Sequence, residues 1–142
     1  MANANKIFLA LKGYLEDAHI NGLTAETIYD QNSAVQPGKD KMFVSIDLYP
    51  VTVAEDRTER LSVLPYEASI TVSVPMRLGT SYASSVASRI TRRFSEQSPE
   101  KCAFILPGGK FYVTAVQEAT GYVENGMYRN TIHVLIDVYE LR

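Results

Sequence analysis

Residues 66–94 read YEASITVSVPMRLGTSYASSVASRITRRF and join two patterns that together decide the fold. In the first half, apolar and polar side chains alternate, as in a strand with one dry and one wet face. After Gly79 the apolar spacing changes to three and four, which is typical of an amphipathic helix that Thr80 or Ser81 can cap. The side chains predicted to face the core are Ala68, Ile70, Val72, Val74, Met76, Ala83, Val86, Ala87, Ile90 and Phe94.

The same two periods extend through the rest of the chain. Residues 7–18 carry apolar side chains at helical spacing, and residues 42–53 alternate like a second strand with a bend near Pro50. Further strands are predicted over residues 102–106, 111–123 and 128–141, with turns at 107–109 and at Asn125-Gly126. Between the first helix and the first long strand we expect a short extended piece around Ile28, followed by loop.

The predicted fold class is α+β: a mostly antiparallel sheet of about five strands with two helices on one face, in the order α-β-β-α-β-β-β. A length of 142 residues fits one domain spanning 1–142. If Val44, Ile70 and Ile136 point toward the helices, the other face of the sheet is polar and rich in tyrosine. That open face is expected to carry Tyr49, Ser69, Thr71, Ser73, Thr131, His133, Asp137 and Tyr139.

Composition narrows the classes of function. A net charge of −2 argues against a dedicated nucleic-acid binder, because contacts to phosphates require an excess of Lys and Arg on one face. The one cysteine, Cys102, can form no internal disulfide, and the N-terminal residues are too polar for a signal peptide or a membrane span. We therefore expect a chain of the reducing cytoplasm that makes no contact with a membrane.

Catalytic and metal-binding motifs are not indicated. His19 is expected at a helix end and His133 in a strand, and neither lies near a nucleophile motif. One cysteine and two distant histidines cannot supply a structural zinc site. Gly108-Gly109 lacks the following helix and the Lys-Ser/Thr pair of a phosphate-binding loop. The expectation is a chain that is not an enzyme and needs no cofactor or metal.

Three surface features admit either a bland or a functional interpretation. The charged segment 54–65 is predicted to be a mobile loop, which is either a solvated connection or a segment that becomes ordered on a partner. The arginines of the second helix form either a solvated face or contacts to a subunit or a phosphate. The nine tyrosines either pair across strands or enrich an interface core, above all in the C-terminal hairpin.

Taken in order, these pieces resemble the tail-terminator proteins of long-tailed bacteriophages, over nearly the whole chain. The pieces are the amphipathic first helix, IYDQNSAVQP at 28–37, MFVSIDLYP at 42–50, ASITVSVPMRLG at 68–79 running into the second helix, and the terminal hairpin. The resemblance implies a structural virion protein that assembles in the host cytoplasm as a hexameric ring. Such a ring caps the tail-tube protein, ends tail polymerisation, meets a head-side connector protein and leaves a channel for DNA.

Within that resemblance, the hypotheses for individual residues follow from their expected exposure and type. Docking to the tube or connector is assigned to the charged segment, at Asp56, Arg57, Glu59 and Arg60. Contacts between subunits are assigned to Arg92, Arg93, Tyr122 and Tyr128. Each assignment is an expectation about interfaces, because no chemistry is expected of these side chains.

Three alternatives remain open from the sequence. Another head-to-tail connector or neck protein would share the ring and differ in its neighbour. A small enzyme or ligand-binding domain would need a cleft on the open sheet face, to which only Asp137 and His133 could contribute. An RNA-binding sheet could stack bases on Tyr49 and Tyr139, although the acidic balance of the chain speaks against it.

Overall fold

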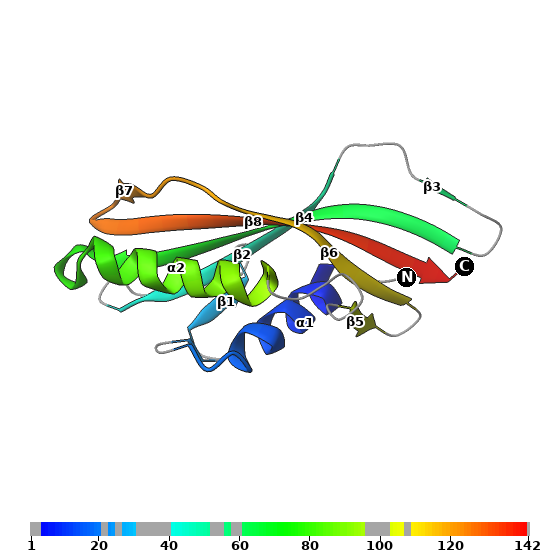
Figure 1. Cartoon of the computed structure of the whole chain (residues 1–142), viewed down its shortest axis with the longest axis horizontal. Helices are drawn as coiled ribbons and strands as arrows, with labels where there is room; N and C mark the ends of the chain where they lie inside the picture. Colours follow the sequence, from blue (N-terminus) through cyan, green and yellow to red (C-terminus); the bar gives the residue numbers. More distant parts are fainter. Residues whose placement is uncertain are drawn as a thin grey trace.

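The computed structural model describes residues 4–20, 23–24, 27–30, 41–51, 56–57, 61–95, 103–106 and 109–141. Two helices, α1 (Ala4–Glu16) and α2 (Thr80–Ser95), lie on one side of a twisted sheet (Figure 1). A short 3-10 helix, η1 (Met76–Leu78), joins the sheet to α2. The strands are β1 (Ile28–Asp30), β2 (Phe43–Pro50), β3 (Asp56–Arg57), β4 (Leu61–Pro75), β5 (Ala103–Leu106), β6 (Gly109–Glu118), β7 (Tyr122–Glu124) and β8 (Met127–Leu141).

Neighbouring strands follow the order β1-β2-β4-β8-β6-β5, with β3 beside β4 and β7 beside β8. Among the described strands, only β1 and β2 pair in parallel. The long central pair β4 and β8 is in register from Leu61 opposite Leu141 to Pro75 opposite Met127. The α+β class, with two helices covering one face of a mostly antiparallel sheet, is therefore confirmed.

The core lies between the sheet and the two helices. Alternate residues of β2, β4 and β8 point toward the helices because successive side chains of a strand face opposite sides. From α2, Ile90 and Phe94 are almost wholly buried against them, and burial of side chains of this size contributes about 1.5–3 kcal/mol each. The sheet's share of the core includes Val44, Ile46, Ala68, Ile70, Val72, Val74, Ile132, Val134, Ile136 and Val138. The predicted inward position of Met76 is wrong, because this residue begins η1 and is 47% exposed.

The prediction of a mobile loop over 54–65 is wrong for part of that segment. Strand β4 begins at Leu61, five residues earlier than expected, and Asp56 and Arg57 form β3 beside it. The strand continues because β8 is equally long and supplies a pairing partner for each residue of β4 as far as Leu61. Charged residues are ordinary on a short edge strand such as β3, so their density did not indicate a loop.

The predicted strand 111–123 is divided in the structure. A bulge between Val113 and Ala115 adds one residue to β6, which ends at Glu118, and β7 resumes pairing with β8 at Tyr122. The Asn125-Gly126 turn is confirmed, and both residues have positive φ, at 53° and 76°. Two positive values match the type I′ turn that suits the twist of a hairpin.

Candidate functional site

The open face of the sheet carries the polar side chains that the alternation predicted. Ser69 pairs with His133 and Thr71 with Thr131, so these residues of β4 and β8 lie side by side on the face away from the helices. Not every polar side chain of this face is exposed to solvent. Ser73 is completely buried, because Arg129 lies across it and donates a hydrogen bond from Nη1 to Ser73 Oγ at 2.9 Å.

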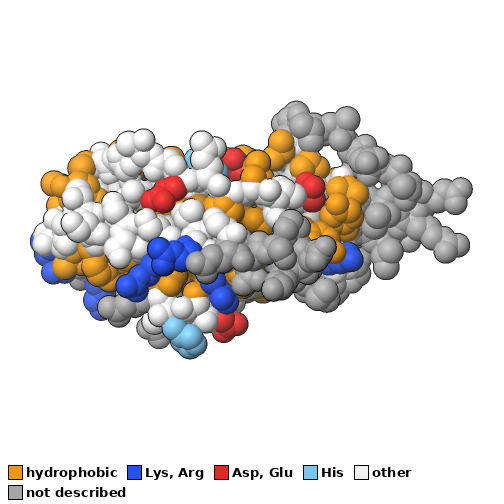
Figure 2. Space-filling model, viewed as in Figure 1, with side chains coloured by type: hydrophobic (Ala, Val, Ile, Leu, Met, Phe, Trp, Pro, Cys, Tyr) orange, Lys and Arg blue, Asp and Glu red, His pale blue; other side chains and the backbone are white. Residues whose placement is uncertain are grey.

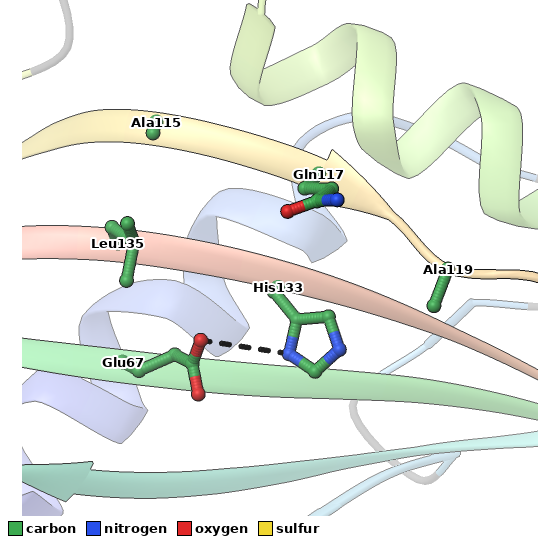
Figure 3. A pocket seen from close by; sticks show the side chains of 6 residues that line it. All are labelled: Glu67, Ala115, Gln117, Ala119, His133 and Leu135. Carbon is green, nitrogen blue, oxygen red and sulfur yellow. Dashed lines mark ion pairs between the residues drawn. The ribbon is translucent and has the colours of Figure 1, made fainter.

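A hollow of about 370 Å³ opens on this face between β4, β8 and β6 (Figure 3). Two neighbouring rows of the sheet form it: one row holds Glu67, Leu135 and Ala115, and the next holds His133 and Gln117. The space exists because β6 contributes the small Ala115 beside its bulge, and Ala119 follows at the strand's end. The lining combines apolar side chains with a carboxylate, an imidazole and an amide.

Glu67 of the hollow and the neighbouring Ser69 lie beside the same ring nitrogen of His133. His133 Nδ1 lies 3.6 Å from Glu67 Oε1 and 3.3 Å from Ser69 Oγ, and the Tyr49 hydroxyl lies 3.3 Å from Ser69 Oγ. A nucleophile–base–acid relay needs the hydroxyl and the carboxylate on different nitrogens of the histidine. Here the Glu67 carboxylate and the Ser69 hydroxyl both lie beside Nδ1, so the geometry is that of a polar cluster and not of a hydrolytic relay.

Asp137, the other residue considered for a cleft, does not line the hollow. It lies opposite Pro65 of β4 and Tyr112 of β6, farther along the sheet. Beside it on the same face, Lys110 Nζ stands 5.3 Å from the centre of the Tyr112 ring, and the hydrogen bond to Tyr112 raises the pKa of Lys110. The sequence therefore found one residue of the hollow, His133, and missed Glu67 and Gln117.

The arginines of α2 occupy two different environments. Arg92 is exposed on the outer side of the helix, whereas Arg93 is half-buried toward α1. The Arg93 guanidinium lies 4.1 Å from the centre of the Tyr14 ring, and the Tyr14 hydroxyl donates a hydrogen bond to the Arg93 carbonyl at 2.8 Å. Of the two, Arg92 is therefore the side chain that a neighbouring molecule can reach.

The two tyrosines of the C-terminal hairpin, Tyr122 and Tyr128, also differ in their exposure to solvent. Tyr122 is 45% exposed, while Tyr128 packs against the core from the helix side of the sheet. Tyr122 belongs to a group of exposed apolar side chains at the end of the sheet where β7 lies, which we call the apolar tip (Figures 1 and 2). Met76 is held at this end of the sheet because its amide donates a hydrogen bond to the Gly126 carbonyl at 3.3 Å. The apolar tip consists of Met76, Leu78, Tyr122 and Val123.

The predicted docking segment is described only in part. Asp56 and Arg57 form β3 and pair with Val63 and Ser62 of β4. Glu59 and Arg60 lie outside the described residues.

Neither a metal cluster nor a membrane helix is found in the part of the chain that the structure describes. No three side chains of His, Cys, Asp or Glu there come together as metal ligands. No helix within those residues is long and apolar enough to cross a membrane.

Comparisons with known proteins place the fold in context. No family model matches the sequence, and no curated protein matches it. One solved structure matches with a TM-score of 0.65 and 17% identity, over 97% of this chain and 96% of its own. A chain from the virion of a native gene transfer agent particle matches with a TM-score of 0.56 and 18% identity, over 98% of both chains. The chain therefore shares its whole fold with a component of a virion particle.

Proposed function

We propose that the chain is a structural virion protein that caps the tail tube as a ring, ends tail polymerisation and offers a surface for joining to the head. The observation that carries the proposal is the fold shared, over 98% of both chains, with a chain of a gene transfer agent virion. The resemblance of the sequence pieces to tail terminators points the same way. Together they favour a role in assembly over a role in catalysis.

The surface of the protomer supports this role. Exposed apolar side chains scattered singly are ordinary, but the four of the apolar tip gather at one end of the sheet. Tyrosine and methionine are enriched where proteins meet, because tyrosine buries a large rigid ring and the flexible methionine adapts to irregular surfaces. The apolar tip is therefore a contact surface of the assembled particle in this proposal.

A ring is one assembly that identical copies form when each copy contacts the next through two different surfaces. A head-to-tail contact between different surfaces of identical copies closes into a ring when its rotation divides a full turn. We propose six copies, with the tail-tube protein on one side and a head-side connector protein on the other. A net charge of −2 suits a lumen through which DNA slides, because an acidic or neutral wall does not hold phosphates. The ring forms in the host cytoplasm and needs no cofactor.

The first test is the mass of the purified protein by light scattering over a tenfold range of concentration, at low and at moderate salt. A hexamer, or an equilibrium between monomer and hexamer, supports the proposal, and electron microscopy should then show rings. A strict monomer at every concentration and both salts contradicts a ring that forms by itself.

Another head-to-tail connector or neck protein is the second candidate, because the virion neighbour fixes no position within the particle. The two candidates differ in the partner that the ring binds. A terminator ring sediments with purified tail tubes, whereas a neck ring sediments with head particles and not with tubes.

A further inference from the structure

The two exposed faces of the protomer differ in charge. Helix α2 contains Arg89, Arg92 and Arg93 and no acidic residue, and its remaining exposed side chains are mostly serines. The open sheet face carries the carboxylates of Asp47, Glu67 and Asp137, beside the exposed Tyr49 and Leu135. The cations of this face do not line the hollow: Lys110 lies against Tyr112, and Arg129 lies against Ser73 and Glu124. In Figure 2 blue side chains gather over α2, whereas red and pale blue side chains lie at both the upper and the lower edge of the view.

The hollow on the open face has the chemistry of an arginine receptor. Leu135, Ala115 and Ala119 offer an apolar wall for the aliphatic stem of an arginine, which buries its methylene groups while its head stays polar. The Glu67 side chain is only 22% exposed and can accept two parallel hydrogen bonds from a guanidinium. Gln117 adds an amide oxygen at the rim.

The outer side of α2 is shaped to deliver such a side chain. Arg92 follows Ser88 by four residues and Ser85 by seven, so the three lie in one row on the exposed side of the helix. Serine side chains are short and allow the helix to approach a sheet closely along this row, and the exposed Arg89 lies beside the row, one turn before Arg92. The threonines of the open face, Thr71 and Thr131, can exchange hydrogen bonds with these serines.

We propose that the hollow between Glu67, His133 and Gln117 receives Arg92 of a second copy, so that the outer side of α2 lies on the open sheet face of the next protomer. This inference rests on the proposed ring. The hollow lies on β4, β8 and β6, the same strands that α2 covers from the other side. The contact joins two different surfaces, so it is heterologous and repeats from copy to copy, as a ring requires.

Two charge reversals test the contact. In Glu67→Arg the hollow repels Arg92 of the neighbour, and in Arg92→Glu the helix brings a carboxylate to Glu67. Each variant alone should weaken self-association roughly tenfold or more, measured by light scattering. An equimolar mixture of the two should reassemble, because every contact of a ring in which the variants alternate again joins one arginine to one glutamate. Lys41→Glu and Asp17→Arg, which reverse exposed charges elsewhere, should leave the mass unchanged.

The outcomes separate this inference from the ring itself. Rings that persist in both single variants overturn the contact and leave the proposed function standing. Variants that disperse alone but do not reassemble when mixed also overturn it, since Glu67 and Arg92 are then not partners. If instead the rings persist and only binding to tail tubes is lost, the hollow receives a cation of the tube protein and not of a second copy. A wild-type chain that stays monomeric at every concentration overturns this contact as one that forms in solution and contradicts a ring that forms by itself.

Discussion

Tyr14 and Arg93 bind one another twice: the tyrosine hydroxyl donates to the Arg93 carbonyl at 2.8 Å, and the guanidinium lies 4.1 Å from the centre of the tyrosine ring. Tyr14 also contacts Phe94 and Phe104, with ring centres 5.2 and 5.0 Å apart. The pair therefore ties the last turn of α2 to α1 and to β5. The carbonyl it satisfies belongs to the end of a helix, where such groups have no partner within the helix.

Replacing Tyr14 with Phe should lower the free energy of unfolding by about 1 kcal/mol, because the hydrogen bond is lost while the ring contacts remain. Urea unfolding measures the change, and the mass in solution should not alter. An unchanged midpoint would mean that water replaces the hydroxyl at the helix end without loss.

Arg92 and Arg93 should respond differently to the same substitution. Arg93→Glu removes a cation from the face of an aromatic ring and puts a negative charge at the negative end of α2, so it should cost about 1–2 kcal/mol of stability. Arg92→Glu puts a negative charge at the same helix end but leaves the contact between Arg93 and the Tyr14 ring in place, so it should cost only about 0.5 kcal/mol. Equal losses in urea unfolding would show that the two side chains share one environment.

The apolar tip should matter for assembly and not for folding. Tyr122→Ser combined with Val123→Thr removes exposed apolar area, so the free energy of unfolding should stay within about 1 kcal/mol of its original value. Binding to ring neighbours or tail tubes should weaken, as judged by sedimentation of the mixture. Leu9→Ser, an equally exposed leucine on α1, is the matched control. A control as damaging as the test variant would mean that general loss of apolar surface, and not the tip, is responsible.

Two glycine substitutions should shift stability in opposite directions. Gly126→Ala places a side chain at φ 76° in the hairpin turn and should cost about 1 kcal/mol or more. Gly13→Ala lies within α1, where an added methyl group meets nothing within 4 Å, and should gain about 0.5–1 kcal/mol. Thermal unfolding of both variants beside the wild type gives the two signs directly.

Local sequence patterns predicted most of the helices and strands. Alternation identified β2, β4 and β8, helical spacing identified α1 and α2, and the Asn-Gly pair identified the turn between β7 and β8. The sequence pattern did not predict that β4 starts as early as Leu61, because this start depends on the length of the partner strand β8 and not on the residues of β4. Pairing between distant segments is the information that periodicity lacks.

The same limit explains what the sequence missed at the candidate site. Glu67 and His133 are 66 positions apart and meet only through the register of β4 with β8. Gln117 joins them only because the bulge after Val113 shifts the last residues of β6 by one. Arg92 and Arg93 were grouped because they are adjacent, although successive residues of a helix lie about 100° apart around its axis.

Filling the hollow tests its use without changing any charge. Ala115 is exposed on β6, so Ala115→Leu should fold normally, because a larger apolar side chain is tolerated on the surface of a strand. The larger side chain occupies the space beside Leu135 and Glu67 that the proposed arginine needs, so self-association should weaken while urea unfolding stays unchanged. Thr120→Leu, an exposed position outside the lining, controls for added apolar surface. Self-association as strong as in the wild type would mean that nothing enters the hollow, since a leucine side chain and an arginine stem cannot share that wall.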